Sequence, residues 1–361
     1  MLYPSTDQEL FGITVMISSE MIEFGDFREE ASKTASVINS CVYSPPNSTT
    51  SPDWLLHKHR NNPDGVSTYF LMKENEEPTA HICVQKRLMA NSENVEFAYN
   101  PNDLVSLSSR PMASLLLYRA VAKYVQTLNV TTYHSSNPKS DFFYSKILKK
   151  EQVGKLEMKA AILSLPKTHR LSKFNFLLLL FWKLQRASLA IFYKNSAVEI
   201  VSVEEFSSED LEDLDFTSSD LFLKRDATRL NWRFSNHNPE RQYSRFLVSL
   251  NGRVVGYFIT TKVVFDEITG IAIVDFYFSK MTPVVRSKVI RHLLTLSNES
   301  NVVFCICNTE SNLAKSLFGF PFIRVPQRLQ PQTFPIYLMS SNANPFKSLK
   351  TFMTLFDLDI L

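Results

Sequence analysis

Polar and aromatic residues between positions 137 and 146 carry the groups best suited to chemistry in this sequence. Asn137, Ser140, Tyr144 and Lys146 supply an amide, a hydroxyl, a phenol and an amine. Phenols and amines are side chains that can exchange protons with a bound molecule. An asparagine-led turn after a β-rich run is typical of a helix start, so we expect the four groups on one helix.

A second copy of this segment lies in the other half of the chain. Asn308 to Ser311 matches Asn137 to Ser140 at a shift of 171 places. Lys315 then stands at the position of Tyr144. The sequence therefore predicts the same strand, turn and helix twice, and only the first copy has the tyrosine.

Further matches extend the repeat over both halves. Asn62-Pro63 recurs as Asn238-Pro239 at a shift of 176, and Asp103 recurs as Asp275 at a shift of 172. So long a period indicates two whole domains, and a chain of 361 residues suits two domains of about 150 to 180 residues. The predicted division is residues 1–168, an apolar linker at 169–195 and residues 196–361.

The composition narrows the class of protein. Apolar residues make up 44% of the chain, enough for a core in each half. The net charge is only +3 and no dense Lys/Arg block occurs, so we expect no nucleic-acid partner. Cys305 and Cys307 lie at strand spacing, which predicts two buried thiols and no metal site. Residues 1–20 lack the basic segment followed by an apolar segment that marks a secretion signal, so the expected compartment is the cytoplasm.

Apolar periodicity and turn residues predict the same order of elements in both halves. The order is helix, helix, strand pair, strand, helix, strand, helix, strand. In the first half, Asp103 to Leu107 forms the central strand and Pro111 to Thr127 the central helix. In the second half, Asn251-Gly252 predicts a hairpin and Pro335 to Met339 the last strand.

The segment from Phe174 to Phe192 is apolar but contains Lys183 and Arg186. Its continuous apolar part is shorter than a membrane span. The favoured prediction is a helix packed between the two domains. A helix lying on a membrane surface is the second option and a true span the third.

The helix of Asn137 to Lys146, with the order of elements around it, resembles the GNAT (GCN5-related N-acetyltransferase) family. The resemblance covers both halves. It implies an α+β fold of two tandem GNAT-like domains, each a mixed, mostly antiparallel sheet flanked by helices, joined by the apolar linker helix. The segment from Arg225 to Lys262 is similar to tandem GNAT proteins associated with bacterial surface polysaccharide genes.

The resemblance implies acetyl-CoA or another acyl-CoA as co-substrate. The family's pyrophosphate loop, Arg/Gln-x-x-Gly-x-Gly/Ala, falls on Ser108, Pro111 and Ala113, of which only Ala113 agrees. Pro111 has no N–H to offer a phosphate at the helix start. The residues implied to contact the co-substrate are Val105, Leu107, Ser108, Ser109, Arg110, Met112, Ala113, Ser114, Asn137 and Ser140.

The resemblance also implies catalytic roles. Tyr144 would protonate the departing thiolate, which suits a phenol with an ordinary pKa of about 10. Asp103 and His134, at strand ends, are the candidates for the base that accepts a proton from the acceptor amine. Each has a plain structural alternative, because helix aromatics usually pack in cores and strand-end polar groups are usually bonded locally.

The leading hypothesis is an acyl-CoA-dependent N-acyltransferase whose acceptor is an amine, such as an amino sugar or a cell-envelope precursor. The first half would hold acyl-CoA, and the second half would shape the acceptor site or a homodimer. The alternatives are a non-catalytic GNAT-fold binding module and a Fem-like aminoacyltransferase. Peripheral contact with the inner face of the membrane through 174–192 is a further option.

Overall fold

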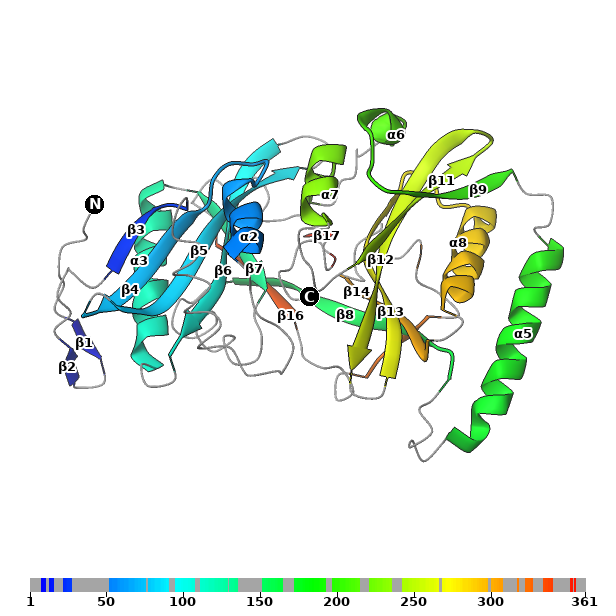
Figure 1. Ribbon diagram of the computed structural model, residues 1–361, viewed down its shortest axis with the longest axis horizontal. Coiled ribbons are helices and arrows are strands. Elements are labelled where there is room, and N and C mark those ends of the chain that lie inside the picture. Colours follow the sequence, from blue (N-terminus) through cyan, green and yellow to red (C-terminus); the bar gives the residue numbers. More distant parts are fainter. Residues whose placement is uncertain are drawn as a thin grey trace.

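In the described residues, the computed structural model contains one continuous sheet of 15 strands and a separate two-stranded sheet. The continuous sheet divides into a mixed sheet with helices on its faces in each half of the chain (Figure 1). Helices and strands alternate in the α+β manner that the sequence predicts. The structure describes residues 8–10, 13–15, 22–27, 52–75, 77–90, 95–107, 111–128, 130–135, 151–164, 172–192, 197–214, 221–235, 242–265, 268–297, 300–307, 317, 322–326, 334–339, 351–352 and 354.

The first half contains a mixed sheet with one long helix on one face and a short helical segment on the other. From residue 52 to residue 135 the order of its elements matches the prediction, whereas the first and last predicted helices lie outside the described residues. They are β1 (Gln8–Leu10), β2 (Ile13–Val15), β3 (Ile22–Asp26), α2 (Pro52–Leu55), the π-helical turn η2 (Leu56–Arg60), β4 (Thr68–Glu74), β5 (Glu77–Ala90), β6 (Val95–Ser106), α3 (Pro111–Leu128) and β7 (Thr131–Ser135).

The second half repeats this plan. Asn251 and Gly252 have φ angles of +53° and +77°, as a tight hairpin turn between its first long strands requires. Its elements are β9 (Val198–Val203), α6 (Ser208–Glu212), α7 (Ala227–Arg233), β11 (Tyr243–Leu250), β12 (Arg253–Phe265), β13 (Ile268–Phe278), α8 (Pro283–Leu296) and β14 (Val302–Cys307).

The parallel strand pair at the centre of each sheet preserves the register of the repeat. In the first half β6 pairs with β7 from Ala98 opposite Thr131. In the second half β13 pairs with β14 from Gly270 opposite Val302. These positions differ by 172 and 171 places, the shifts found in the sequence, so the two halves are copies of one fold.

The two halves exchange strands, which the sequence analysis did not foresee. The last strand of the second half, β16 (Phe334–Met339), lies between β7 and β8 of the first sheet. In return β8 (Glu151–Ile162) continues into the second sheet, where its later residues pair with β14 and with β15 (Ile323–Arg324). Strands from each half therefore pair with strands of the other half, so the predicted boundaries at 168 and 196 do not separate the two sheets.

A smaller exchange occurs at the far end of β5. There β10 (Leu221–Leu223), from the second half, pairs with residues 89 and 90 of β5. The short strand β17 (Thr351–Phe352) pairs in turn with β10. Segments from the second half thus complete the first sheet at two separate places.

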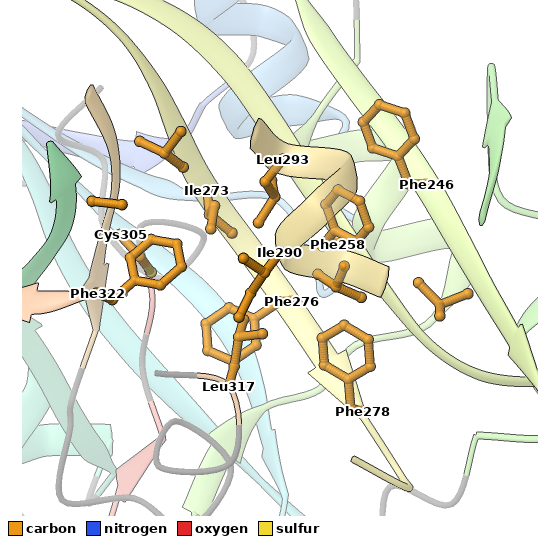
Figure 2. Packing of buried hydrophobic residues seen from close by; sticks show 14 of the residues in the cluster. Phe246, Phe258, Ile273, Phe276, Phe278, Ile290, Leu293, Cys305, Leu317 and Phe322 are labelled. Carbon is orange, nitrogen blue, oxygen red and sulfur yellow. The ribbon is translucent and has the colours of Figure 1, made fainter. Parts of the chain in front are cut away.

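Each sheet packs a long helix on one face. Figure 2 shows Ile290 and Leu293 of α8 against Phe258, Ile273 and Phe276 of the second sheet. In the first half, buried apolar side chains of α3 pack against β4 and β5 in the same way. Cys305 and Cys307 on β14 are buried, which confirms the prediction of two buried thiols at this strand spacing.

The apolar linker is helical, as predicted, but it does not pack between the halves. Helix α5 (Asn175–Phe192), which follows the short turn η4 (Ser172–Phe174), lies at the outer end of the second half (Figure 1). It contacts α8, and the Trp182 indole N–H donates to the Ile162 carbonyl at 2.8 Å. Among the helices that the structure describes, none combines the length and hydropathy of a membrane crossing.

Candidate functional site

Asp103 lies on β6 just beyond the point where the parallel strands cease to pair. The ladder between β6 and β7 consists of two residue pairs and stops at Tyr99 and Thr132, although β6 runs on to Ser106. Asp103 has a φ of +53°, opposite an irregularity in the register of β5 between His81 and Cys83. Positive φ is uncommon outside glycine and is held only where surrounding contacts fix it.

Lys58 and His59 hold the Asp103 carboxylate. The Lys58 ammonium donates to both carboxylate oxygens at 2.8 Å, and the Nε2 atom of His59 lies 2.8 Å from one of them. The other ring nitrogen of His59 lies 3.1 Å from the Ser67 hydroxyl. The Asp103 side chain is 19% exposed, whereas those of Lys58 and His59 are 6% and 0% exposed.

The π-helical turn η2 presents these two side chains. The Asn61 N–H donates to the Leu56 carbonyl, five residues back, at 3.1 Å. The Gln85 amide donates to the Lys58 carbonyl at 3.0 Å, and the Asn62 amide donates to the carbonyl of residue 86 at 2.8 Å. These bonds fasten the turn to β5, above the face of the sheet from which Asp103 projects. Single π-helical turns occur often at functional sites.

His81 and Cys83 extend the cluster along β5. The Nδ1 atom of His81 donates to the Asp103 carbonyl at 3.3 Å, and its Nε2 atom lies 3.4 Å from the Cys83 sulfur. Burial lowers the pKa of His81 from 6.5 to about 4, although the Asp103 charge opposes the shift. The ring is therefore neutral near pH 7, with its proton on Nδ1 and the thiol donating to Nε2.

This buried histidine should make stability depend on pH. Between pH 6.5 and about 4 the unfolded chain binds a proton at His81 that the folded chain does not, so the free energy of unfolding falls as pH falls. The expected loss is about 3 kcal/mol, at roughly 1.4 kcal/mol per pKa unit. Urea unfolding of the wild type and His81→Gln from pH 7 to 4 measures it. Parallel profiles for the two proteins would contradict the assignment.

The partners of Asp103 also set its acidity. Burial alone would raise its pKa, but the charge of Lys58 and the hydrogen bond and charge of His59 hold the pKa well below its usual range. The group is therefore a carboxylate at any ordinary pH and a weaker proton acceptor than a free aspartate. Its geometry suits a counter-ion for Lys58 and a hydrogen-bond partner for His59, and its role as general base stays a prediction.

The equivalent position in the second half is closed. Asp275 is fully buried and accepts hydrogen bonds from the Arg225 guanidinium at 3.0 to 3.2 Å, from the Tyr257 hydroxyl at 2.8 Å and from the Thr354 hydroxyl at 2.7 Å. Because every donor is internal, this carboxylate has a structural role. Each copy therefore pairs an aspartate with a cation, Lys58 in the first and Arg225 in the second. Of the two aspartates, only Asp103 is partly exposed.

A polar junction connects the first site to the second half. The Trp232 indole on α7 donates to the His57 carbonyl at 2.9 Å, and the Nε2 atom of His57 lies 2.8 Å from the Ser235 hydroxyl. Ser235 also lines a cavity of about 750 Å³. The other described residues that line this cavity are Ser202, Val203, Glu204, Glu205, Tyr243, Ser244 and Arg245.

The structure places some of the predicted co-substrate residues at the end of β6 and the start of α3. The hydroxyls of Ser106 and Ser114 lie 2.7 Å apart and connect the two elements. Val105 packs with the cluster around Leu55, while the Leu107 N–H donates to the Thr79 carbonyl at 3.0 Å. On the first turns of α3, Met112 is exposed and Ala113 is buried.

Other predicted site residues cannot be placed at the site. Ser108, Ser109, Arg110, Asn137, Ser140 and Tyr144 lie outside the described residues. The backbone of His134 belongs to β7 and pairs with Tyr337 of β16, so the neighbouring strand comes from the other half of the chain.

Lys58, His59, His81 and Cys83 are not among the site residues predicted from the sequence. The available signal was the run His57-Lys58-His59, in which three successive side chains can bind or release a proton. Their convergence on Asp103 depends on how η2 crosses the sheet, which local sequence does not reveal.

Comparison with known proteins places this geometry in a recognised fold. No protein-family model and no curated protein matches the sequence. Among solved structures, a GCN5-related N-acetyltransferase from Anabaena variabilis ATCC 29413 aligns over 89% of this chain and 73% of its own, with a TM-score of 0.60 and 8% identity. A probable N-acyltransferase from Enterococcus faecalis V583 aligns over 90% and 74%, with a TM-score of 0.60 and 8% identity.

The N-myristoyltransferase of Saccharomyces cerevisiae, solved with bound myristoyl-CoA, covers the chain most fully of these three. It aligns over 99% of this chain and 91% of its own, with a TM-score of 0.55 and 9% identity. At such identities the likeness establishes the fold. Together with the duplicated parallel ladder, it shows that the chain has the tandem GNAT fold, with two mixed sheets flanked by helices.

Proposed function

We propose that this chain is an acyl-CoA-dependent N-acyltransferase and that its first half holds the acyl-CoA. The main support is the short ladder between β6 and β7. It ends at Tyr99 and Thr132, so the residues of β6 from Asn100 to Ser106 have no β7 partner along the described strands. The backbone groups on that side of β6 are those that we expect to contact the co-substrate.

The residues around this edge fit such a ligand in part. Helix α3 begins with Pro111 directly beyond the edge, so the positive end of an 18-residue helix faces the region where a pyrophosphate would lie. The bond between Ser106 and Ser114 holds that helix start against β6. Pro111 removes one N–H, so Ser108 to Arg110 are proposed to supply the remaining contacts.

Acyl-CoA would supply an activated acyl group as a thioester. We propose that the amine acceptor attacks it directly, without a covalent enzyme intermediate. The Leu107 N–H already donates to Thr79, so the N–H of Val105 or Ser106 is the proposed donor to the acyl oxygen. Tyr144 is proposed as the acid, and Asp103 and His134 remain the proposed bases.

The acceptor is proposed to enter from the cavity beside Ser235. Ser235 lines that cavity and lies 2.8 Å from His57, the neighbour of Lys58 in the chain, and hydroxyl groups, two glutamates and Arg245 also line it. Glu204 and Glu205 suit a cationic amine, and the surrounding hydroxyls suit a polyhydroxylated molecule such as an amino sugar. Acetyl-CoA is the proposed donor. The cytoplasm is the proposed compartment, where buried thiols such as that of Cys83 stay reduced.

Calorimetry with acetyl-CoA, myristoyl-CoA and CoA tests the donor. We expect the wild type to bind at least one of them. Tyr144→Phe should bind it equally well but turn over an amine at least about 100-fold more slowly, because general acid catalysis contributes that much. Tyr124→Phe, which removes a phenol of α3 that is bonded to Thr68 of β4, is the matched control and should keep full turnover.

Three outcomes separate the alternatives. Absence of binding by the wild type would exclude the acyl-CoA proposal. Binding without turnover of any amine would favour the non-catalytic module, which the closed environment of Asp275 in the second half also favours. Equal turnover by Tyr144→Phe and the wild type would remove Tyr144 from the mechanism while leaving the activity in place.

A further inference from the structure

Helix α5 exposes an unusual amount of apolar surface. Phe176 and Leu184 are 64% and 63% exposed, although large apolar side chains of this kind are normally covered. The exposed apolar side chains on this helix and on the turn before it are Phe174, Phe176, Leu177, Leu179, Leu180, Phe181 and Leu184.

The helix has one face fixed to the protein and one facing outward. Trp182 is only 6% exposed and its indole N–H is bonded to β8, while Leu178 packs on the second core. Phe176, Leu180 and Leu184 are spaced by four residues, so they form one stripe on the side away from Trp182. Figure 1 shows α5 as the outermost element of the second half.

The sequence that contains this stripe carries charges of one sign. Between Glu157 and Glu199 the sequence contains no Asp or Glu. It contains the cations Lys159, Lys167, Arg170, Lys173, Lys183, Arg186 and Lys194. Helix α8, which contacts α5, also lacks acidic residues and carries Arg286, Lys288 and Arg291. Lys173 and Lys183 on η4 and α5 are themselves exposed.

We propose that α5 docks on the surface of a bilayer that contains anionic lipids. The helix lies in the plane of the interface, with the stripe of Phe176, Leu180 and Leu184 among the acyl chains and the neighbouring lysines at the headgroups. Charge selects this occupant over a second copy of the chain. Two copies meeting through α5 would bring their own cations together, whereas anionic headgroups neutralise them.

Vesicle co-sedimentation of the full chain tests the proposal. We expect binding to vesicles of phosphatidylcholine with about one third phosphatidylglycerol, at least tenfold weaker binding to phosphatidylcholine alone, and weaker binding at high salt, as an electrostatic contribution requires. Phe176→Ser/Leu180→Ser should bind at least tenfold more weakly. Val201→Ser/Val264→Ser, at positions 52% and 69% exposed on β9 and β12, is the matched control and should bind like the wild type.

A charge variant completes the design. Lys173→Glu/Lys183→Glu should remove the preference for phosphatidylglycerol, and thermal unfolding shows whether each variant is folded. Failure of the wild type to bind the anionic vesicles overturns the proposal, as does wild-type binding by the folded serine variant of α5. A light-scattering mass of two chains that falls to one in that variant, without vesicle binding, would assign the stripe to a homodimer instead.

Discussion

Residues 1–168 expressed alone will not unfold in a single cooperative transition. In the intact chain β16 pairs with four residues of β7 and with five of β8, so the excised half loses a central strand of its sheet. The later part of β8 also loses its pairing with β14. Two bare edges would then face water, a condition that natural sheets avoid. Circular dichroism during heating, with hydrogen exchange of β7, measures the effect.

A matched fragment serves as the control. Residues 1–168 joined by a flexible linker to residues 330–341 restore β16 at its place, and this chain should regain a cooperative transition and slow exchange in β7. If the bare fragment unfolds as sharply as the fragment with β16, the strand exchange is not needed for the stability of the first half. The predicted boundary at 168 would then describe an independent domain.

Arg225→Met should lower the free energy of unfolding by about 3 to 5 kcal/mol. Removal of one partner from a buried ion pair leaves the other charge uncompensated, and that cost is of this size. Asp275 would keep the Tyr257 and Thr354 hydroxyls but lose its counter-ion in a site with no exposure. Urea unfolding followed by tryptophan fluorescence gives the value.

Two comparisons make this result specific. Arg225→Met/Asp275→Leu removes both charges and should recover most of the loss, because well-packed apolar replacements of buried pairs are often neutral. Lys58→Met should cost less than Arg225→Met, since Asp103 is 19% exposed and keeps His59. An effect of Arg225→Met below about 1 kcal/mol, the net contribution of one ordinary hydrogen bond, would contradict the structural role of the pair.

Local sequence correctly predicted elements whose signals lie within a few residues. The helix that begins at Pro111 was expected to end at Thr127 and ends at Leu128, and the Asn251-Gly252 turn has the backbone that its residues favour. The predicted start of β6 at Asp103 was wrong. Asn100-Pro101-Asn102 has the composition of a turn, yet it lies within a strand that begins at Val95, where Pro101 pairs opposite Val84. There the neighbouring strand overrides local preference.

The candidate site divides in the same way. Asp103 attracted attention as a polar residue at a strand end that recurs in the repeat, and the structure places it beside the parted strands. Its side-chain partners Lys58 and His59 come from η2, more than forty residues earlier in the chain. Its backbone partner His81 lies on β5, where the register between β5 and β6 shifts. The spacing of these residues in the chain does not predict the distances between them in the fold.

The sequence by itself determined the duplication and the order of elements in each half, and its resemblance to the GNAT family implied the tandem fold. Tertiary structure alone decided that β8 and β16 cross between the halves, that α5 lies on an outer flank, and that Lys58 and His59 meet at Asp103. The reason is physical. Periodicity and turn chemistry report what neighbouring residues prefer, whereas strand pairing, helix placement and ion pairing depend on which distant surfaces come together when the cores form.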